Sequence, residues 1–263
     1  MTDTISRRDF LKKTTIAVAG VLIPVAALEI LSPARVQALR TDEGVRWAFL
    51  VDTYKCVGCG FCVKACKLEN EVPYDAAASR TWVERYVLTK DGGFHADSPN
   101  AARDGFTDPR IDQNESGYLT IAPDEIDKAF FVPKLCNQCE RPPCVQVCPV
   151  GATFKAPDGV VLVDRSWCIG CGYCIMACPY GARFFHPKYH TAEKCTFCYH
   201  RITKGLKPAC VQACPFGARQ IGNLNDPDDP VTKVITTERV GVLRKEYGTK
   251  PQVFYVGLDR EVR

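Results

Sequence analysis

The stretch Cys168-Ile-Gly-Cys171-Gly-Tyr-Cys174-Ile-Met-Ala-Cys178-Pro179 decides the fold of this chain. Its first three thiols lie three residues apart, so one loop can wrap them around a single bound group. The fourth thiol comes four residues later and is followed by a proline that turns the chain away, so this thiol points elsewhere. The stretch therefore predicts bound groups that occur in pairs, each completed by a thiol from a separate part of the chain.

The sixteen cysteines of the chain form four such clusters, and no cysteine is left over. Three of the clusters end in Cys-Pro-x-Gly-Ala, so the chain contains an internal repeat. The first cluster departs from this repeat, because Lys67 stands where the others have proline. In chain order the clusters are Cys56, Cys59, Cys62 and Cys66; Cys136, Cys139, Cys144 and Cys148; Cys168, Cys171, Cys174 and Cys178; and Cys195, Cys198, Cys210 and Cys214.

The third cluster has the spacing C-x2-C-x2-C-x3-C-P that is typical of bacterial ferredoxins. In that pattern three thiolates hold one [4Fe-4S] cube, and the fourth thiolate reaches a neighbouring cube. At four thiolates per cube, the sixteen cysteines predict four [4Fe-4S] clusters, with iron bound by every cysteine.

Disulfides and zinc are the alternative interpretations of so many cysteines. Disulfide scaffolds are typical of short exported chains that lack a core, whereas this chain has 263 residues, of which 46% are apolar. Zinc takes four ligands from two C-x2-C pairs and has no use for a third cysteine at the same spacing. A structural zinc protein without redox activity nevertheless stays open as a function of another class.

Two further classes have no basis in the sequence. Covalent haem needs C-x-x-C-H, and the chain has no such motif. A formal charge of +4, with no basic stripe, gives no reason to expect a nucleic-acid partner.

Residues 1–38 have the features of a signal peptide. Adjacent Arg7 and Arg8 precede an apolar stretch at 14–28, and Val36-Gln37-Ala38 resembles a cleavage site with small residues. The paired arginines followed by Phe-Leu-Lys are similar to the twin-arginine type, which exports proteins already folded. We expect cleavage after Ala38 and a place in the periplasm or on the outer face of the cytoplasmic membrane. A retained membrane anchor is the alternative, but we expect no membrane span in the mature chain.

The repeated turn predicts the fold of residues 39–263. Proline ends a helix and glycine permits a tight turn, so each copy should end a short helix and begin a strand. Strands are expected at 160–163 and 183–185. The resulting fold class is α+β, a duplicated bacterial-ferredoxin-like fold with two bicluster halves.

Two segments lie outside the repeat. An insertion at about 82–132 should contain a strand at 86–88 and then a polar, irregular part at 91–117. An insertion of this length covers a cluster or contacts a partner subunit, or else is a solvated loop. A C-terminal extension at about 220–263 should contain a helix at 231–247 and a closing strand at 251–257.

The four motifs, their order and the leader together resemble the four-cluster electron-transfer subunits of molybdopterin oxidoreductase complexes. The stretches Lys194-Cys-Thr-Phe-Cys-Tyr-His-Arg201 and Pro208-Ala-Cys-Val-Gln-Ala-Cys214 are similar to the tetrathionate and polysulfide reductase branch. The resemblance implies a subunit that is not itself an enzyme. It would relay electrons between a catalytic molybdopterin subunit and an integral membrane, quinone-linked subunit. Subunits of the sulfite-reductase-associated membrane complex, which has haem and membrane partners, are also similar and leave a second complex open.

The resemblance also implies which cysteines share a cluster, because in that family the first motif pairs with the fourth and the second with the third. Each quartet then takes three thiols from one motif and one from its partner motif. Quartet one is Cys56, Cys59, Cys62 and Cys214; quartet two is Cys66, Cys195, Cys198 and Cys210; quartet three is Cys148, Cys168, Cys171 and Cys174; quartet four is Cys136, Cys139, Cys144 and Cys178.

Four charged or titratable residues near these motifs are not counted as ligands. Lys55 and Lys194 each precede the first cysteine of a motif, where a cation would favour a reduced cluster unless the amine faces water. His186 and His190 are expected to have packing or surface roles, since the cysteines complete the ligand count.

Overall fold

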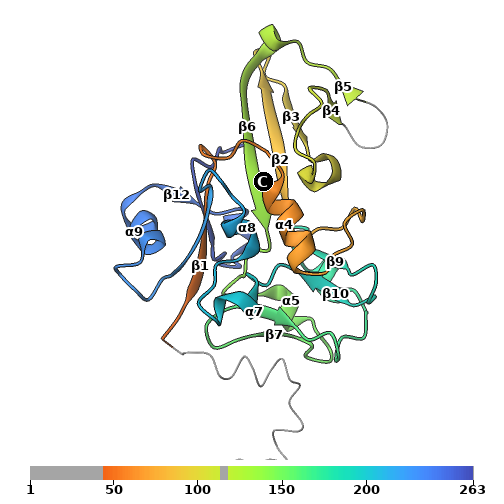
Figure 1. Ribbon diagram of the computed structural model, residues 1–263, viewed down its shortest axis with the longest axis vertical. Helices are drawn as coiled ribbons and strands as arrows, with labels where there is room; N and C mark the ends of the chain where they lie inside the picture. Colours follow the sequence, from red (N-terminus) through yellow and green to blue (C-terminus); the bar gives the residue numbers. More distant parts are fainter. Residues whose placement is uncertain (1–43, 113–117, 263) are drawn as a thin grey trace, which may run out of the picture.

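The computed structural model describes residues 44–112 and 118–262 of the chain. The predicted signal peptide at 1–38 lies outside these residues. In the described part, short helices alternate with several small β-sheets (Figure 1). This mixture agrees with the predicted class. None of the helices in the described ranges is long and apolar enough to cross a bilayer.

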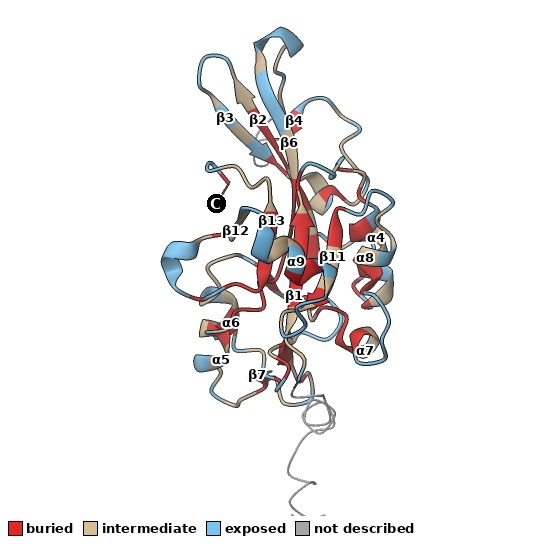
Figure 2. Ribbon diagram, turned by 90° about the vertical axis from the view of Figure 1, so that its left-hand side faces the viewer, coloured by how far each residue is buried: buried red, intermediate tan, exposed pale blue. Residues whose placement is uncertain are grey.

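A four-stranded sheet forms the centre of the molecule, and its strand order is β11-β1-β13-β12. Strand β1 (Trp47–Asp52) pairs antiparallel with β11 (Arg219–Asn223) and parallel with β13 (Val253–Val256). The middle of β1 is a continuous apolar run that is buried on both faces, as expected of a central strand. Figure 2 shows the buried residues gathered along these three strands. The sheet therefore brings the first motif, which follows β1, beside the fourth motif, which precedes β11.

Each repeated turn ends a four-residue helix and leads into a strand, as predicted. The helices are α5 (Pro143–Gln146), α6 (Tyr173–Met176) and α8 (Ala209–Gln212). The strands that follow them are β7 (Thr153–Lys155), β9 (Arg183–Phe185) and β11. Strand β7 pairs with β8 (Val161–Val163), and β9 pairs with β10 (Ala192–Lys194). Helix α7 (Tyr199–Ile202) lies in the long loop of the fourth motif.

The first motif differs because it lacks the proline. Helix α4 (Phe61–Glu69) continues through Cys66 instead of ending before it. Proline at position 67 would remove a helical N–H and clash with the preceding turn, whereas lysine allows the helix to continue. The exit of the chain from this motif is therefore helical.

The insertion forms a three-stranded antiparallel sheet with the order β3-β2-β6. Its strands are β2 (Thr81–Thr89), β3 (Phe94–Asp97) and β6 (Ile126–Leu135), and their far ends project from the body of the molecule (Figure 1). The predicted strand at 86–88 is confirmed, but it is longer than expected. The prediction that 91–117 is irregular is wrong in part. Its described residues include β3, the 3-10 turn η1 (Pro99–Ala102) and β4 (Ile111–Asp112), which pairs with β5 (Tyr118–Leu119).

A buried ion pair explains how such a polar segment becomes ordered. The Arg85 guanidinium donates to both carboxylate oxygens of Asp97, at 2.9 and 2.6 Å. The same guanidinium donates to the carbonyl oxygens of Asp108 and Arg110, so it joins β2 to the following loop. Composition alone does not reveal such a pairing.

The C-terminal extension contains a shorter helix than predicted. Helix α9 (Pro230–Thr237) ends at Glu238, which is extended at φ −105° and ψ 160°. The chain then forms β12 (Val240–Gly241), which pairs with β13, and the 3-10 turn η3 (Lys245–Tyr247). Pairing with the sheet overrides the helical pattern there. The closing strand predicted at 251–257 is confirmed as β13, which is shorter.

Candidate metal centres

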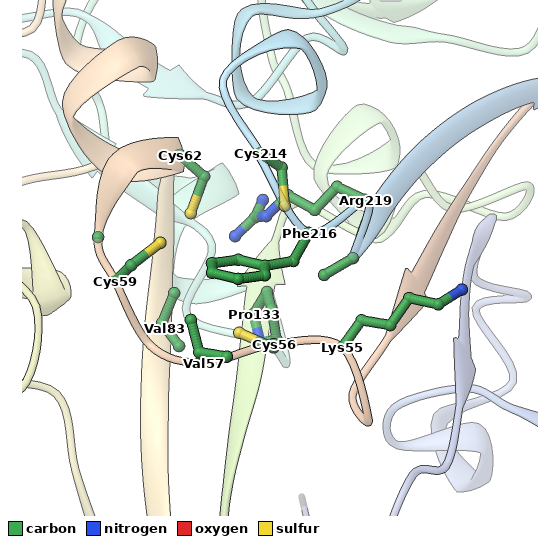
Figure 3. Close-up of a pocket in the computed structure, with 12 residues that line it drawn as sticks. Lys55, Cys56, Val57, Cys59, Cys62, Val83, Pro133, Cys214, Phe216 and Arg219 are labelled. Atoms are coloured by element: carbon green, nitrogen blue, oxygen red, sulfur yellow. The ribbon is translucent and has the colours of Figure 1, made fainter.

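Quartet one is assembled by the pairing of β1 with β11. Cys56, Cys59 and Cys62 lie in the loop between β1 and α4 and at the start of that helix, and Cys214 lies just after α8. All four line one pocket. Figure 3 shows their sulfur atoms turned toward a common space from the two separate segments. The structure therefore brings together the four thiols that were expected to share a cluster.

Quartets two and four also each line one pocket. Three pockets, each lined by three thiols from one motif and one from another, indicate the same kind of occupant. The pockets of quartets two and four are lined by Cys66, Cys195, Cys198 and Cys210, and by Cys136, Cys139, Cys144 and Cys178, respectively.

Quartet three lies where α5 packs against α6. Cys174 belongs to α6, and Cys168 packs with it in a small apolar cluster that also contains Cys144. The Cys148 and Cys168 sulfurs accept hydrogen bonds from the backbone N–H groups of Thr153 and Ala192, both at 3.4 Å. Cys171 is exposed in the same loop. The second and third motifs are thus neighbours here, as expected.

The arrangement of the thiols suits a multi-atom cluster better than a single metal ion. None of the sixteen cysteines forms a disulfide. In the two described ranges, no three His, Cys, Asp or Glu side chains converge closely enough to hold one metal ion. A tetrahedral zinc site requires such convergence, whereas an iron–sulfur cube holds its four thiolates apart.

Burial in apolar surroundings raises the pKa values of several of these thiols. It raises the pKa of Cys56 to about 11, and the pKa values of Cys139 and Cys210 to about 12. Such thiols ionise only when a positive metal core offsets the cost of desolvation, because metal ligation couples to proton release. The donor set and its burial therefore fit [4Fe-4S] groups.

The quartets form a row in the order one, two, four, three. Cys62 of quartet one and Cys210 of quartet two interact electrostatically, as do Cys195 of quartet two and Cys136 of quartet four. The Gln138 side chain, in the loop of quartet four, donates to the Cys195 carbonyl oxygen at 2.6 Å. Quartets four and three meet where Cys144 and Cys174 share one apolar cluster.

The two ends of this row reach the surface, and its middle does not. All four cysteines of quartet two are buried, as are three of quartet four. By contrast, only Cys62 of quartet one and Cys174 of quartet three are buried. The larger of the two residues between the first two cysteines of each motif follows the same rule. Val57 and Ile169 at the ends are 49% and 64% exposed, while Phe197 and Gln138 in the middle are 1% exposed.

The two lysines that precede motifs have different surroundings. Lys55 is exposed, pairs with Asp52 at 2.9 Å, and points its ammonium away from the sulfurs (Figure 3). Lys194 is fully buried, and its ammonium donates to the carbonyl oxygens of Val161 and Cys195. The alternative that both amines face water is therefore wrong for Lys194.

The histidines have the roles expected of them. His186 is buried, and its ring interacts with the Glu71 carbonyl oxygen at 3.2 Å and accepts from the backbone of Lys188. His190 is exposed.

Sequence reasoning missed the polar groups that surround the thiols. The Asn70 amide donates to the sulfurs of Cys66 and Cys198, at 3.5 and 3.8 Å, and Arg80 donates to the Asn70 carbonyl oxygen at 2.6 Å. No local motif marks this asparagine. Two buried arginines, Arg183 and Arg219, were visible as the residue that follows Gly-Ala in two copies of the repeat.

Comparisons with known proteins agree with this geometry. Models described as 4Fe-4S dicluster domains match residues 55–152 and 127–224. The tetrathionate reductase B subunit of Salmonella typhimurium is 39% identical, over 97% of this chain and 89% of that protein. The tetrathionate reductase B subunit of Archaeoglobus fulgidus is 41% identical, over 83% of this chain and 86% of that protein. From the same archaeon, Hdr-like menaquinol oxidoreductase iron-sulfur subunit 1 is 35% identical, over 97% of this chain and 99% of that protein.

Identity over nearly the whole length extends the match beyond the cysteine motifs. The relatives are named as subunits of reductase complexes, which places the chain among electron-transfer subunits rather than catalytic ones. Its sixteen cysteines fit four [4Fe-4S] clusters. The chain belongs to the family of ferredoxin-type 4Fe-4S beta subunits that includes those of the tetrathionate reductases.

Proposed function

We propose that this chain relays electrons through an exported respiratory complex, between a catalytic molybdopterin subunit and a quinone-linked membrane subunit. Each [4Fe-4S] cluster, when bound by one of the four quartets, supplies a one-electron redox centre. The single observation that carries the proposal is the row of quartets with exposed ends and a buried middle. A relay needs two accessible ends and an interior that is shielded from water.

Apolar side chains at the two ends support docking to two partners. Phe61 and Phe216 are about half exposed beside quartet one, and Tyr173 and Met176 are 54% and 75% exposed beside quartet three. Exposed apolar groups of this size are typical of interaction sites. We infer that one end meets the catalytic subunit and the other meets the membrane-linked subunit.

A second complex is favoured by one comparison. The Hdr-like menaquinol oxidoreductase subunit matches 97% of this chain and 99% of its own length. That protein is named as a menaquinol oxidoreductase subunit, which supports a relay linked to quinol in a complex of another kind. Our second candidate is therefore the same relay role in a sulfite-reductase-associated membrane complex with haem and membrane subunits. The two candidate complexes differ only in their partner subunits, and the four quartets could relay electrons in either one.

Purification of the tagged chain from membranes, with identification of the subunits that accompany it, tests the function. We expect about sixteen iron atoms and as much acid-labile sulfide per chain, together with a catalytic and a membrane subunit. Molybdenum in the purified complex supports the molybdopterin complex, and haem without molybdenum supports the second candidate complex. Zinc in place of iron would refute the relay in either form.

Charged substitutions at the two ends test the docking. Phe61→Asp and Met176→Asp should each release a different partner from the purified complex, because burying an unpaired carboxylate at an interface is costly. Tyr247→Asp is the matched control, since Tyr247 is 55% exposed on the C-terminal extension. Iron content should stay unchanged in all three variants. Release of no partner by either end variant would count against this docking arrangement.

A further inference from the structure

Two arginines occupy equivalent places in the internal repeat and are almost completely buried. Arg183 and Arg219 each follow a Cys-Pro-x-Gly-Ala turn and begin strands β9 and β11. They are 5% and 2% exposed, respectively. In the second motif the corresponding residue is Thr153.

Each arginine lies between the two quartets of its own half of the molecule. Arg219 is within electrostatic range of Cys56 and Cys62 in quartet one and of Cys210 in quartet two. Figure 3 shows its guanidinium extending between Cys62 and Cys214.

Arg183 has the corresponding place in the other half. It is within electrostatic range of Cys174 in quartet three and of Cys136 and Cys144 in quartet four. One buried guanidinium thus lies with quartets one and two, and another lies with quartets three and four.

The hydrogen bonds of the two arginines are also alike. Nη1 of Arg219 donates to the Thr81 hydroxyl at 2.8 Å, and Nη1 of Arg183 donates to the Thr153 hydroxyl at 3.3 Å. In both residues Nη2 is buried without a hydrogen-bond partner among the described residues. A threonine fixes one side of each guanidinium. The other side faces quartet thiols, since Arg219 is in hydrogen-bonding reach of Cys210 and Arg183 of Cys174.

The charge of each arginine is also uncompensated. In the described ranges, neither guanidinium forms an ion pair with a carboxylate, although other buried arginines such as Arg80 and Arg85 do. An unpaired buried charge is strongly destabilising. The cysteines of the two adjacent quartets are in range, and once four of them bind a cube as thiolates the cluster carries a net charge of about −2.

We propose that Arg219 and Arg183 are the counter-charges of the two cluster pairs, each shared by both clusters of its half, with Nη2 as a donor to cluster sulfur. A fixed positive charge and a hydrogen bond to sulfur both favour the more negative, reduced state. Each arginine therefore raises the reduction potentials of two clusters and leaves the other two unaffected. This inference rests on the proposed ligation of iron by the quartets.

Redox titration of the cluster-loaded chain, followed by EPR, tests the assignment. Arg219→Gln keeps donor groups without the charge, and it should lower the potentials of two of the four clusters. The expected effect is at least a tenfold fall in the ratio of reduced to oxidised cluster at fixed potential, which corresponds to about 59 mV for one electron. Arg183→Gln should shift the other two clusters. Arg219→Lys and Arg183→Lys keep the charge and should show smaller shifts.

The outcomes separate this role from a structural one. Unchanged potentials in a Gln variant that retains full iron would overturn the proposal, and so would equal shifts in the Gln and Lys variants. If a Gln variant loses iron, retention of iron by the matching Lys variant supports the charge role, whereas loss in both refutes it. Iron and sulfide analysis of the unsubstituted chain tests the ligation itself, so the two failures are distinguishable.

Discussion

At the scale of single residues, the surroundings of a side chain decide its role more than its neighbours in the sequence do. Lys67 shows this most clearly, because it replaces the proline of the other motifs. Its ammonium is buried and donates to the carbonyl oxygens of Pro73, Ala76 and Ala78, at 3.3, 2.5 and 2.9 Å. The lysine therefore lets α4 continue and also organises the loop that leads to the insertion.

Substitution of Lys67 by Met should destabilise the chain by about 2 kcal/mol, since three buried carbonyl oxygens lose their donor. Lys64→Met on the same helix is the matched control, because the Lys64 side chain is 38% exposed and its ion pair with Asp104 is long, at 3.9 Å. Anaerobic urea unfolding measures the difference. Equal midpoints for the two variants would contradict this role for Lys67.

At the scale of elements, the insertion is a cover for the first cysteine loop. Gly60 lies against the backbone of η1, and a Cβ added there would meet the carbonyl oxygens of Ala102 and Arg103, the second at 2.5 Å. Gly58 lies against the rings of Phe106 and Phe131. The prediction that the insertion covers a cluster loop is supported by these contacts, while its contact with a partner stays a prediction.

Gly60→Ala should therefore loosen the insertion and lower the iron content of quartet one. Gly205→Ala is the control, because Gly205 has φ +73°, close to the +77° of Gly60, but nothing within 4 Å of an added Cβ. The control should cost only the strain of positive φ, about 1 kcal/mol. Anaerobic thermal unfolding and iron analysis compare the two. Equal losses would show that backbone strain, and not the cover, matters at position 60.

The elements themselves were predictable to different degrees. The short helices and strands around the repeat follow from proline and glycine, which act locally. Strand β3 and the early end of α9 depend on partners that are distant in the sequence, namely Arg85 for Asp97 and β13 for Val240. Local pattern cannot supply such contacts.

At the scale of the whole molecule, the cysteines are part of the core. Cys62, Cys136, Cys195 and Cys210 pack in the main apolar cluster with the residues of the central sheet. Most helices have four residues, too few to be stable alone. The motif spacing predicted which three thiols of one motif bind the same cluster. The family resemblance predicted which thiol of another motif completes each quartet. The order of the quartets in the row depends on how the halves pack, so it could not be read from spacing.

Removal of iron should therefore unfold most of the chain. Anaerobic treatment with a chelator and an oxidant is expected to abolish the cooperative thermal transition and the near-UV circular dichroism, because ligand binding and folding are coupled. Reconstitution with iron and sulfide should restore both signals. An apo chain that keeps its native spectrum would show that the core folds without its clusters.

The pairing of β1 with β11 and β13 fixes the order in which the cluster sites can be completed during synthesis of the chain. Quartets three and four have all their thiols once the ribosome has passed Cys178, whereas quartet one waits for Cys214. The partner strand β13 at residues 253–256 is made later still. Cofactor delivery to the first motif thus follows synthesis of the fourth motif, and the nascent chain exposes the four thiols of the first motif until then.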